Sequence, residues 1–206
     1  MRRFAGMVGV LVLAALTVGQ TPPATPDPLR DPVRRLPDQF GQATPKAALD
    51  SALKAVDRGR FDYLVAHLLD PGFVDAQVAA RSLRLEEGVE RELRLVRDRQ
   101  RRDGSLGRDE RLPDDPAEFG RRVRAEAARR AFRQLADDVR GTLAENPDHL
   151  ADLRRFLRSG QLLEAGDTAS FGLKDSRDRA VYLKKTAAGW HLEDRRTDAT
   201  VPADRK

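Results

Sequence analysis

The sequence predicts an α+β domain in which about five N-terminal helices pack on a small C-terminal antiparallel sheet. Apolar residues recur at helical spacing over residues 44–160 and alternate with polar residues over 161–196, as they do in strands. We find no internal repeat. We therefore expect a single domain over residues 44–197, helical over 44–160 and folded as a meander sheet over 161–196.

Composition limits both the core and the chemistry. The chain of 206 residues has 40% hydrophobic residues but no cysteine, which excludes disulfides, thiolate metal sites and cysteine nucleophiles. The formal net charge of +5 is too small to indicate a nucleic-acid partner. No glycine loop of a phosphate-binding type is present, so we predict no nucleotide cofactor, and indeed no cofactor at all.

The N-terminal segment is typical of an export signal. Arg2 and Arg3 precede an uncharged apolar stretch over residues 4–18, which is short for a membrane span. We expect a signal peptide over 1–19, a Pro-rich disordered linker over 20–43 and a disordered tail over 198–206. This predicts an exported protein, periplasmic, secreted or in the cell envelope, that contacts the membrane only through the signal if that segment stays uncleaved.

Capping residues and turns divide the helical part. Thr44-Pro45 favours a helix start and Gly59 a helix end, and a second helix from Phe61 ends at Asp70-Pro71-Gly72. A long charged helix is predicted over 75–102, weakly broken at Gly88. After a polar loop, Asp115-Pro116 starts a fourth helix that runs to about residue 145. A short fifth helix is predicted over 148–159.

The strands follow from alternation between turn residues. Their apolar positions should share one face that packs against the two N-terminal helices; they are Ala169, Phe171, Leu173, Val181, Leu183, Trp190 and Leu192. On the same reasoning, His191 lies on the polar face and is expected to be exposed to solvent.

Three passages resemble the nuclear-transport-factor-2-like superfamily, the cone-shaped α+β fold of SnoaL-like and ketosteroid-isomerase-like proteins. Residues 47–69 resemble its opening helix pair, residues 166–169 the start of a central strand, and Gly189-Trp190-His191-Leu192 the final strand. The stretch 75–160 is longer and more helical than the family pattern. A simpler helical cap on a small sheet is therefore the alternative architecture.

The resemblance implies a possible proton-transfer site, because enzymes of this superfamily use a pocket carboxylate or a His-Asp pair. Here the candidate catalytic residues are His67 and Asp70, with Tyr63 one helical turn before His67. The alternative to a catalytic role is that His67 is a half-exposed residue at the end of a helix. No ligand spacing for a metal is present, so we predict no metal site.

The Arg-rich third helix gives a second candidate site. Glu–Arg pairs four residues apart indicate a solvated, self-paired surface; they are Glu87–Arg91 and Glu90–Arg94 on this helix and Glu126–Arg130 on the next. The end of the third helix is least balanced by acids, and the candidate anion-binding residues there are Arg97, Arg99, Arg101 and Arg102. No aromatic residue in this run could stack on bases, which argues against nucleic acid.

Three functional hypotheses remain open. The leading one is a non-enzymatic exported domain that binds an envelope partner through its surface or a shallow apolar pocket. The second is a proton-transfer enzyme or small-ligand binder that uses His67 and Asp70. The third is a binder of anionic envelope polymers, lipids or proteins through residues 94–102.

Overall fold

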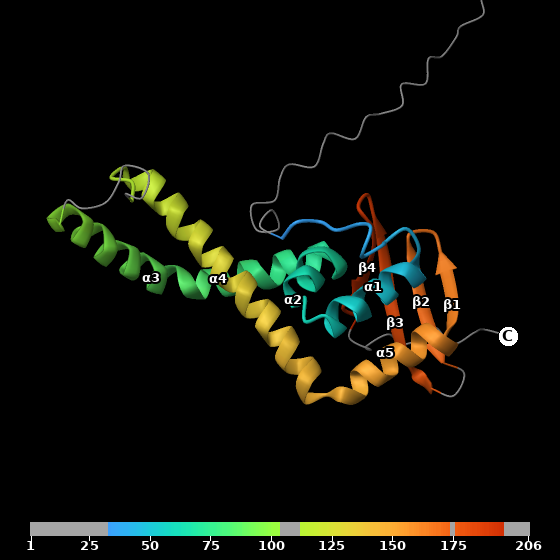
Figure 1. The fold of residues 1–206 in the computed structure, drawn as a ribbon. Coiled ribbons are helices and arrows are strands. Elements are labelled where there is room, and N and C mark those ends of the chain that lie inside the picture. Colours follow the sequence, from blue (N-terminus) through green and yellow to red (C-terminus); the bar gives the residue numbers. More distant parts are fainter. Residues whose placement is uncertain (1–32, 104–111, 174–175, 196–206) are drawn as a thin grey trace, which may run out of the picture.

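The computed structural model describes residues 33–103, 112–173 and 176–195 and confirms the α+β class (Figure 1). The predicted signal peptide over 1–19, the linker up to residue 32 and the tail over 198–206 lie outside these ranges. The helices are α1 (Pro45–Asp57), α2 (Phe61–Tyr63), the π-helix η1 (Leu64–Leu68), α3 (Pro71–Asp103), α4 (Pro116–Glu145) and α5 (Pro147–Ser159). The strands are β1 (Gln161–Ala165), β2 (Thr168–Leu173), β3 (Ser176–Thr186) and β4 (Gly189–Glu193).

Local capping explains why α1 and α4 begin where the sequence predicts. The Thr44 hydroxyl accepts a hydrogen bond from the Ala47 amide at 3.1 Å, and the Asp115 carboxylate accepts one from the Glu118 amide at 3.0 Å. Gly59, with φ of 66°, follows the end of α1 as expected. α3 begins four residues earlier than predicted and runs through Gly88 without a break.

The second predicted helix differs from an ordinary amphipathic helix. It starts as α2 and becomes a π-helix, in which the Leu69 amide donates to the Leu64 carbonyl, five residues back. All six residues from Tyr63 to Leu68 are buried, including Ala66 and His67. The prediction of a half-exposed His67 is therefore wrong, because other parts of the chain cover this segment on every side.

The sheet is an antiparallel meander of order β1-β2-β3-β4, as predicted. Ala169 pairs with Leu183 and Leu183 with Leu192, so the apolar positions share one face. β1 pairs only with β2 and exposes all five of its side chains. At the opposite edge, the Leu192 carbonyl accepts a hydrogen bond from the Asp70 amide at 2.7 Å, which ties β4 to the end of η1.

The helices that cover this apolar face are α1 and α5. Ala48 and Leu49 of α1 and Phe156 of α5 pack in one cluster with the buried side chains of the sheet, which are Ala169, Phe171, Leu173, Leu183 and Trp190. Figure 1 shows both helices lying across the sheet. The sequence predicts that the two N-terminal helices cover this face of the sheet. Instead, η1 meets β4 where Leu192 packs against the cluster that contains Leu64 and Leu68, and α5 is the second helix on the sheet.

Residues 33–43 form a strap that packs against the domain, which corrects the expectation that they belong to a disordered linker. Phe40 is 2% exposed and its ring lies 4.4 Å from that of Tyr63. The Gln42 carbonyl accepts from the Trp190 amide, and the Gln42 side-chain amide donates to the carbonyls of His67 and Trp190, at 2.7 and 2.9 Å. The strap thus extends along the start of β4.

α3 and α4 form an antiparallel arm that extends away from the sheet (Figure 1). A small cluster of Val89, Phe119, Val123 and Ala127 joins the two helices far from the sheet, and Val78, Ala131 and Leu135 join them nearer to it. The rest of the arm surface is largely polar, as the sequence predicts.

Two glycines allow a test of the strap contact. Gly189 has φ of 121°, and a Cβ there would lie 2.8 Å from Gln42 Cβ and 2.9 Å from Gln42 O. Gly189→Ala should lower the free energy of unfolding by about 1–2 kcal/mol or more. Alanine disfavours the positive φ, and its Cβ would clash with Gln42. Gly88→Ala should raise it by about 0.5–1 kcal/mol, because Gly88 is mid-helix with open space around it. Urea unfolding measures both, and equal effects would contradict the strap geometry.

Candidate functional site

A cavity of about 470 Å³ lies where α1, η1, α3, α4, α5 and β4 meet. Its wall is mostly apolar. The apolar residues that line it are Ala52, Leu53, Val56, Leu64, Leu69, Phe73, Leu135, Val139, Leu143, Leu153 and Leu192. The sheet contributes only from β4, so the cavity is bounded mainly by helices and is not the interior of a cone.

Two features of the helices position these walls. Asn146-Pro147 separates α4 from α5, so that Leu143 and Leu153 line the same cavity from consecutive helices. An ion pair between Arg154 of α5 and Asp57 of α1, at 2.6 Å, joins the two helices that cover the sheet. The cavity therefore depends on the packing of α1 and α5 described above.

Polar and charged side chains complete the lining. Arg81 pairs with Asp138 at 3.0 Å and with the side-chain oxygen of Gln77 at 2.5 Å. Glu193 pairs with Arg195 at 2.9 Å, and Asp194 is exposed. Three carboxylates and one guanidinium thus line the cavity, which favours a ligand with a hydrogen-bond donor or a positive charge.

Tyr63 and His67, two of the predicted catalytic residues, do not line this cavity. Their rings are 4.8 Å apart, and both side chains are turned to the strap. The Tyr63 hydroxyl accepts from the Leu36 amide at 3.2 Å, and His67 Nε2 lies 2.6 Å from the Val33 carbonyl oxygen. Because a carbonyl can only accept, His67 Nε2 is the donor. Both residues therefore hold the strap in place.

Asp70, the third candidate, has a structural contact as well. Its carboxylate accepts from the Phe73 amide at 3.3 Å, and its carbonyl accepts from the Val74 amide. This is the pattern of a residue that caps the start of α3. Asp70 is not itself part of the cavity lining, although its neighbours Leu69 and Phe73 are.

His191 is buried at 1% exposure, which corrects the expectation that it faces solvent. It does lie on the polar face of the sheet, but the strap covers that face at β4. Its Nε2 is 3.0 Å from the Thr186 hydroxyl, and its Nδ1 is 3.4 Å from the Gln42 side-chain nitrogen. Burial lowers the pKa of His191, and the charge of Arg35 lowers it further, while Asp70 acts in the opposite direction.

The four arginines predicted to bind anions are divided by the structure. Arg97 packs over the Phe119 ring at 4.3 Å, and Arg101 pairs with Asp114 at 2.5 Å, a contact that raises the pKa of Arg101. Arg99 and Arg102 are exposed. The predicted i,i+4 pairs are present, with Glu87–Arg91 at 3.0 Å, Glu90–Arg94 at 2.5 Å and Glu126–Arg130 at 3.2 Å.

The comparisons give no relative. No family model matches the chain, and no curated protein or solved structure matches it either. Among the helices that the structure describes, none is both long enough and apolar enough to cross a membrane. Within the same ranges, no three His, Asp or Glu side chains come together in a group that could hold a metal ion.

The sequence suggested a shallow apolar pocket but identified neither its lining residues nor its charges. Its apolar residues have the spacing of ordinary core positions, and no local signal separates a cavity wall from a filled core. Arg81 and Asp138 are 57 residues apart. Only the antiparallel pairing of α3 and α4 brings them together, and the sequence does not give that register.

The buried His191 predicts a pH-dependent stability. Its pKa is lowered in the folded state, so the unfolded chain binds more protons as the pH falls through about 6.5, the ordinary value for histidine. The free energy of unfolding should therefore be greatest above pH 7 and decrease as the pH falls from 7 to 5. Urea unfolding at a series of pH values measures this.

His191→Gln is the matched variant, because it keeps a polar side chain that does not titrate. In this variant the free energy of unfolding should decrease less between pH 7 and 5 than in the parent, even if it is lower at every pH. His149→Gln, at an exposed position on α5, should leave the slope unchanged. If the free energy of unfolding depends on pH equally in the His191 variant and in the parent, this account is contradicted.

Proposed function

We propose that this chain is an exported, non-enzymatic binding domain whose ligand is a small, mainly apolar molecule held in the cavity between the helices and β4. The observation that supports it most is the cavity itself. Its volume of about 470 Å³ falls in the range of about 300–1,000 Å³ typical of small-molecule sites. Its apolar wall with a few charged groups is also typical of such sites.

The charges suggest which end of the ligand faces outward. Asp138 and Glu193 already have arginine partners, whereas Asp194 is exposed and has no ion pair among the contacts of the described residues. We infer that the ligand has an apolar body against Leu53, Leu135 and Leu192 and an amine or other donor group near Asp194. Burial of the body would supply most of the affinity.

The proposal keeps two predictions from the sequence. Export to the periplasm or cell envelope is supported by the charged and apolar pattern of residues 1–19. Kinship with the nuclear-transport-factor-2-like superfamily is supported by the order of helices before an antiparallel meander. The proton-transfer alternative has less support, because Tyr63 and His67 hold the strap and Asp70 caps α3.

A blocking substitution tests the cavity. Thr142 lines it and is exposed, so Thr142→Trp should place an indole over the cavity without disturbing the core. N-phenyl-1-naphthylamine, an apolar fluorescent probe, should bind the parent protein, and the variant should bind it about tenfold more weakly, a difference of about 1.4 kcal/mol. Fluorescence titration measures both dissociation constants.

Ala144→Trp is the control for this test. Ala144 is exposed on the same helix two residues away and is not part of the lining. This variant should bind the probe as the parent does. Failure of the parent to bind the probe, or equal loss in both variants, would count against the cavity as a ligand site.

The charge preference is tested with a matched pair of competitors. n-Octylamine should displace the probe better than octanoate, because carboxylates outnumber the arginine in the lining. Exposed charge pairs contribute about 0.2–1 kcal/mol, so we expect a preference of up to about fivefold. Asp194→Asn should reduce it, and a preference for octanoate in the parent would contradict the assignment of the polar end.

A further inference from the structure

Positive charge is dense both at the end of α3 and on α4. Residues 121–134 contain six arginines and one glutamate, a net charge of +5. The end of α3, from 94 to 102, contains five arginines and one aspartate, a net charge of +4. Three arginines of the α3 end are engaged: Arg94 pairs with Glu90, Arg101 pairs with Asp114, and Arg97 packs on Phe119.

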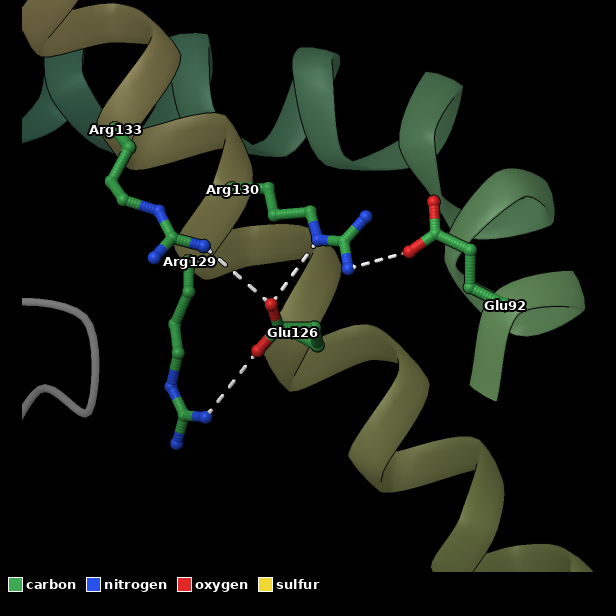
Figure 2. A network of polar contacts seen from close by, with 5 residues as sticks. All are labelled: Glu92, Glu126, Arg129, Arg130 and Arg133. Carbon is green, nitrogen blue, oxygen red and sulfur yellow. Dashed lines mark hydrogen bonds and ion pairs between the residues drawn. The ribbon is translucent and has the colours of Figure 1, made fainter. Parts of the chain in front are cut away.

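Two carboxylates are shared among the arginines at the centre of α4 (Figure 2). Glu126 contacts Arg129 at 3.6 Å, Arg130 at 3.2 Å and Arg133 at 3.5 Å. Glu92 of α3 contacts Arg130 at 2.7 Å, which lowers the pKa of Glu92 and contributes to a raised pKa of Arg130. Arg130 thus holds the two helices together, whereas Arg129 and Arg133, among the residues that the structure describes, share the one carboxylate of Glu126.

Three exposed arginines form one flank of α4, which we call the α4 stripe: Arg122, Arg129 and Arg133. They are separated by seven and four residues, the spacing of one helix flank, and Glu126 lies on the same flank between Arg122 and Arg129. The side chains of Arg129 and Arg133 are 46% and 67% exposed, and Figure 2 shows both beside Glu126, with Glu92 on the other helix. With a rise of 1.5 Å per residue, the stripe is about 16 Å long.

We infer that the α4 stripe docks the domain on the surface of an anionic lipid bilayer, through the phosphates of the headgroups. Guanidinium groups bind phosphate with paired hydrogen bonds and keep their charge at any physiological pH. Each arginine near an anionic surface adds to the attraction. The inference does not depend on the cavity or on the ligand proposed for it.

The shape of the arm favours a flat partner. The stripe lies on a convex helix in an arm that extends from the body of the domain (Figure 1). A straight convex flank can meet several headgroups of a flat surface at once. The cavity, by contrast, meets α4 only at positions 135–143, beyond the stripe. Phe132, the aromatic residue beside the stripe, is buried and offers no platform for bases.

The inference places the anion-binding surface away from the residues that the sequence suggested. Arg97 is packed on Phe119 and Arg101 is paired with Asp114. The stripe carries no large apolar side chain, so binding should be peripheral, without insertion, and reversed by salt.

The test uses vesicle sedimentation. The protein without residues 1–19 keeps every residue that the structure describes, and it avoids binding through the predicted signal peptide. It should sediment with vesicles that contain phosphatidylglycerol, not with vesicles of phosphatidylcholine alone, and should be released by salt. Changing Arg122, Arg129 and Arg133 together to Gln should weaken the binding roughly 100-fold.

The control removes the same charge from α3, by changing Arg84, Arg91 and Arg102 together to Gln. All three are exposed on the other helix of the arm. This variant should keep most of the vesicle binding, and circular dichroism should confirm that both variants are folded. Equal loss in the two variants would show an effect of net charge alone and overturn the inference. Binding of soluble polyphosphate without binding of vesicles would also overturn it, and would assign the stripe to a polymer.

Discussion

The contact of α1 and α5 with one face of the sheet is the interaction on which the rest of the structure depends. Trp190 and Leu183 lie in this contact at 2% and 0% exposure, between Leu49 of α1 and Phe156 of α5. With only 40% hydrophobic residues, the chain has little apolar surface to spare. α3 and α4 accordingly bury their apolar residues mainly against each other and leave the body as an arm.

This arrangement also separates the two surfaces for which we propose binding roles. The cavity forms where the base of the arm meets α1, α5 and β4, so it requires that contact to be intact. The α4 stripe lies further along the arm, where charge and exposure matter more than packing. A domain organised in this way could rest on a charged surface and still leave the cavity accessible to a small ligand.

Much of the fold could be predicted from the sequence because the deciding signals are local. Thr44 and Asp115 cap their own helices, and Gly166 provides the positive φ of the turn between β1 and β2. The strap could not be predicted, because Gln42 reaches Trp190 across 148 residues. The burial of His67 and His191 follows from that strap, which is why sequence reasoning placed both at the surface or at a helix end.

The candidate site was less predictable than the fold for the same reason. His67 is a catalytic candidate in the sequence because histidine can transfer protons near neutral pH, yet in the structure it holds the strap through Val33. Leu135 and Val139 have the spacing of ordinary core residues, and the register of α4 against α1 and α5 decides that they line a cavity. The excess of arginine on α4 is visible in the sequence, but only the structure shows that Arg130 joins α3 through Glu92 while Arg129 and Arg133 stay exposed.

The most direct test of the account is the environment of Trp190, the single tryptophan of the chain. Its fluorescence should be strongly shielded from acrylamide in the folded protein and become accessible in urea. Phe156→Ala should increase the quenching of the folded protein and lower the free energy of unfolding by about 3–5 kcal/mol. A folded protein in which Trp190 is quenched as readily as in urea would contradict the packing of α1 and α5 on the sheet.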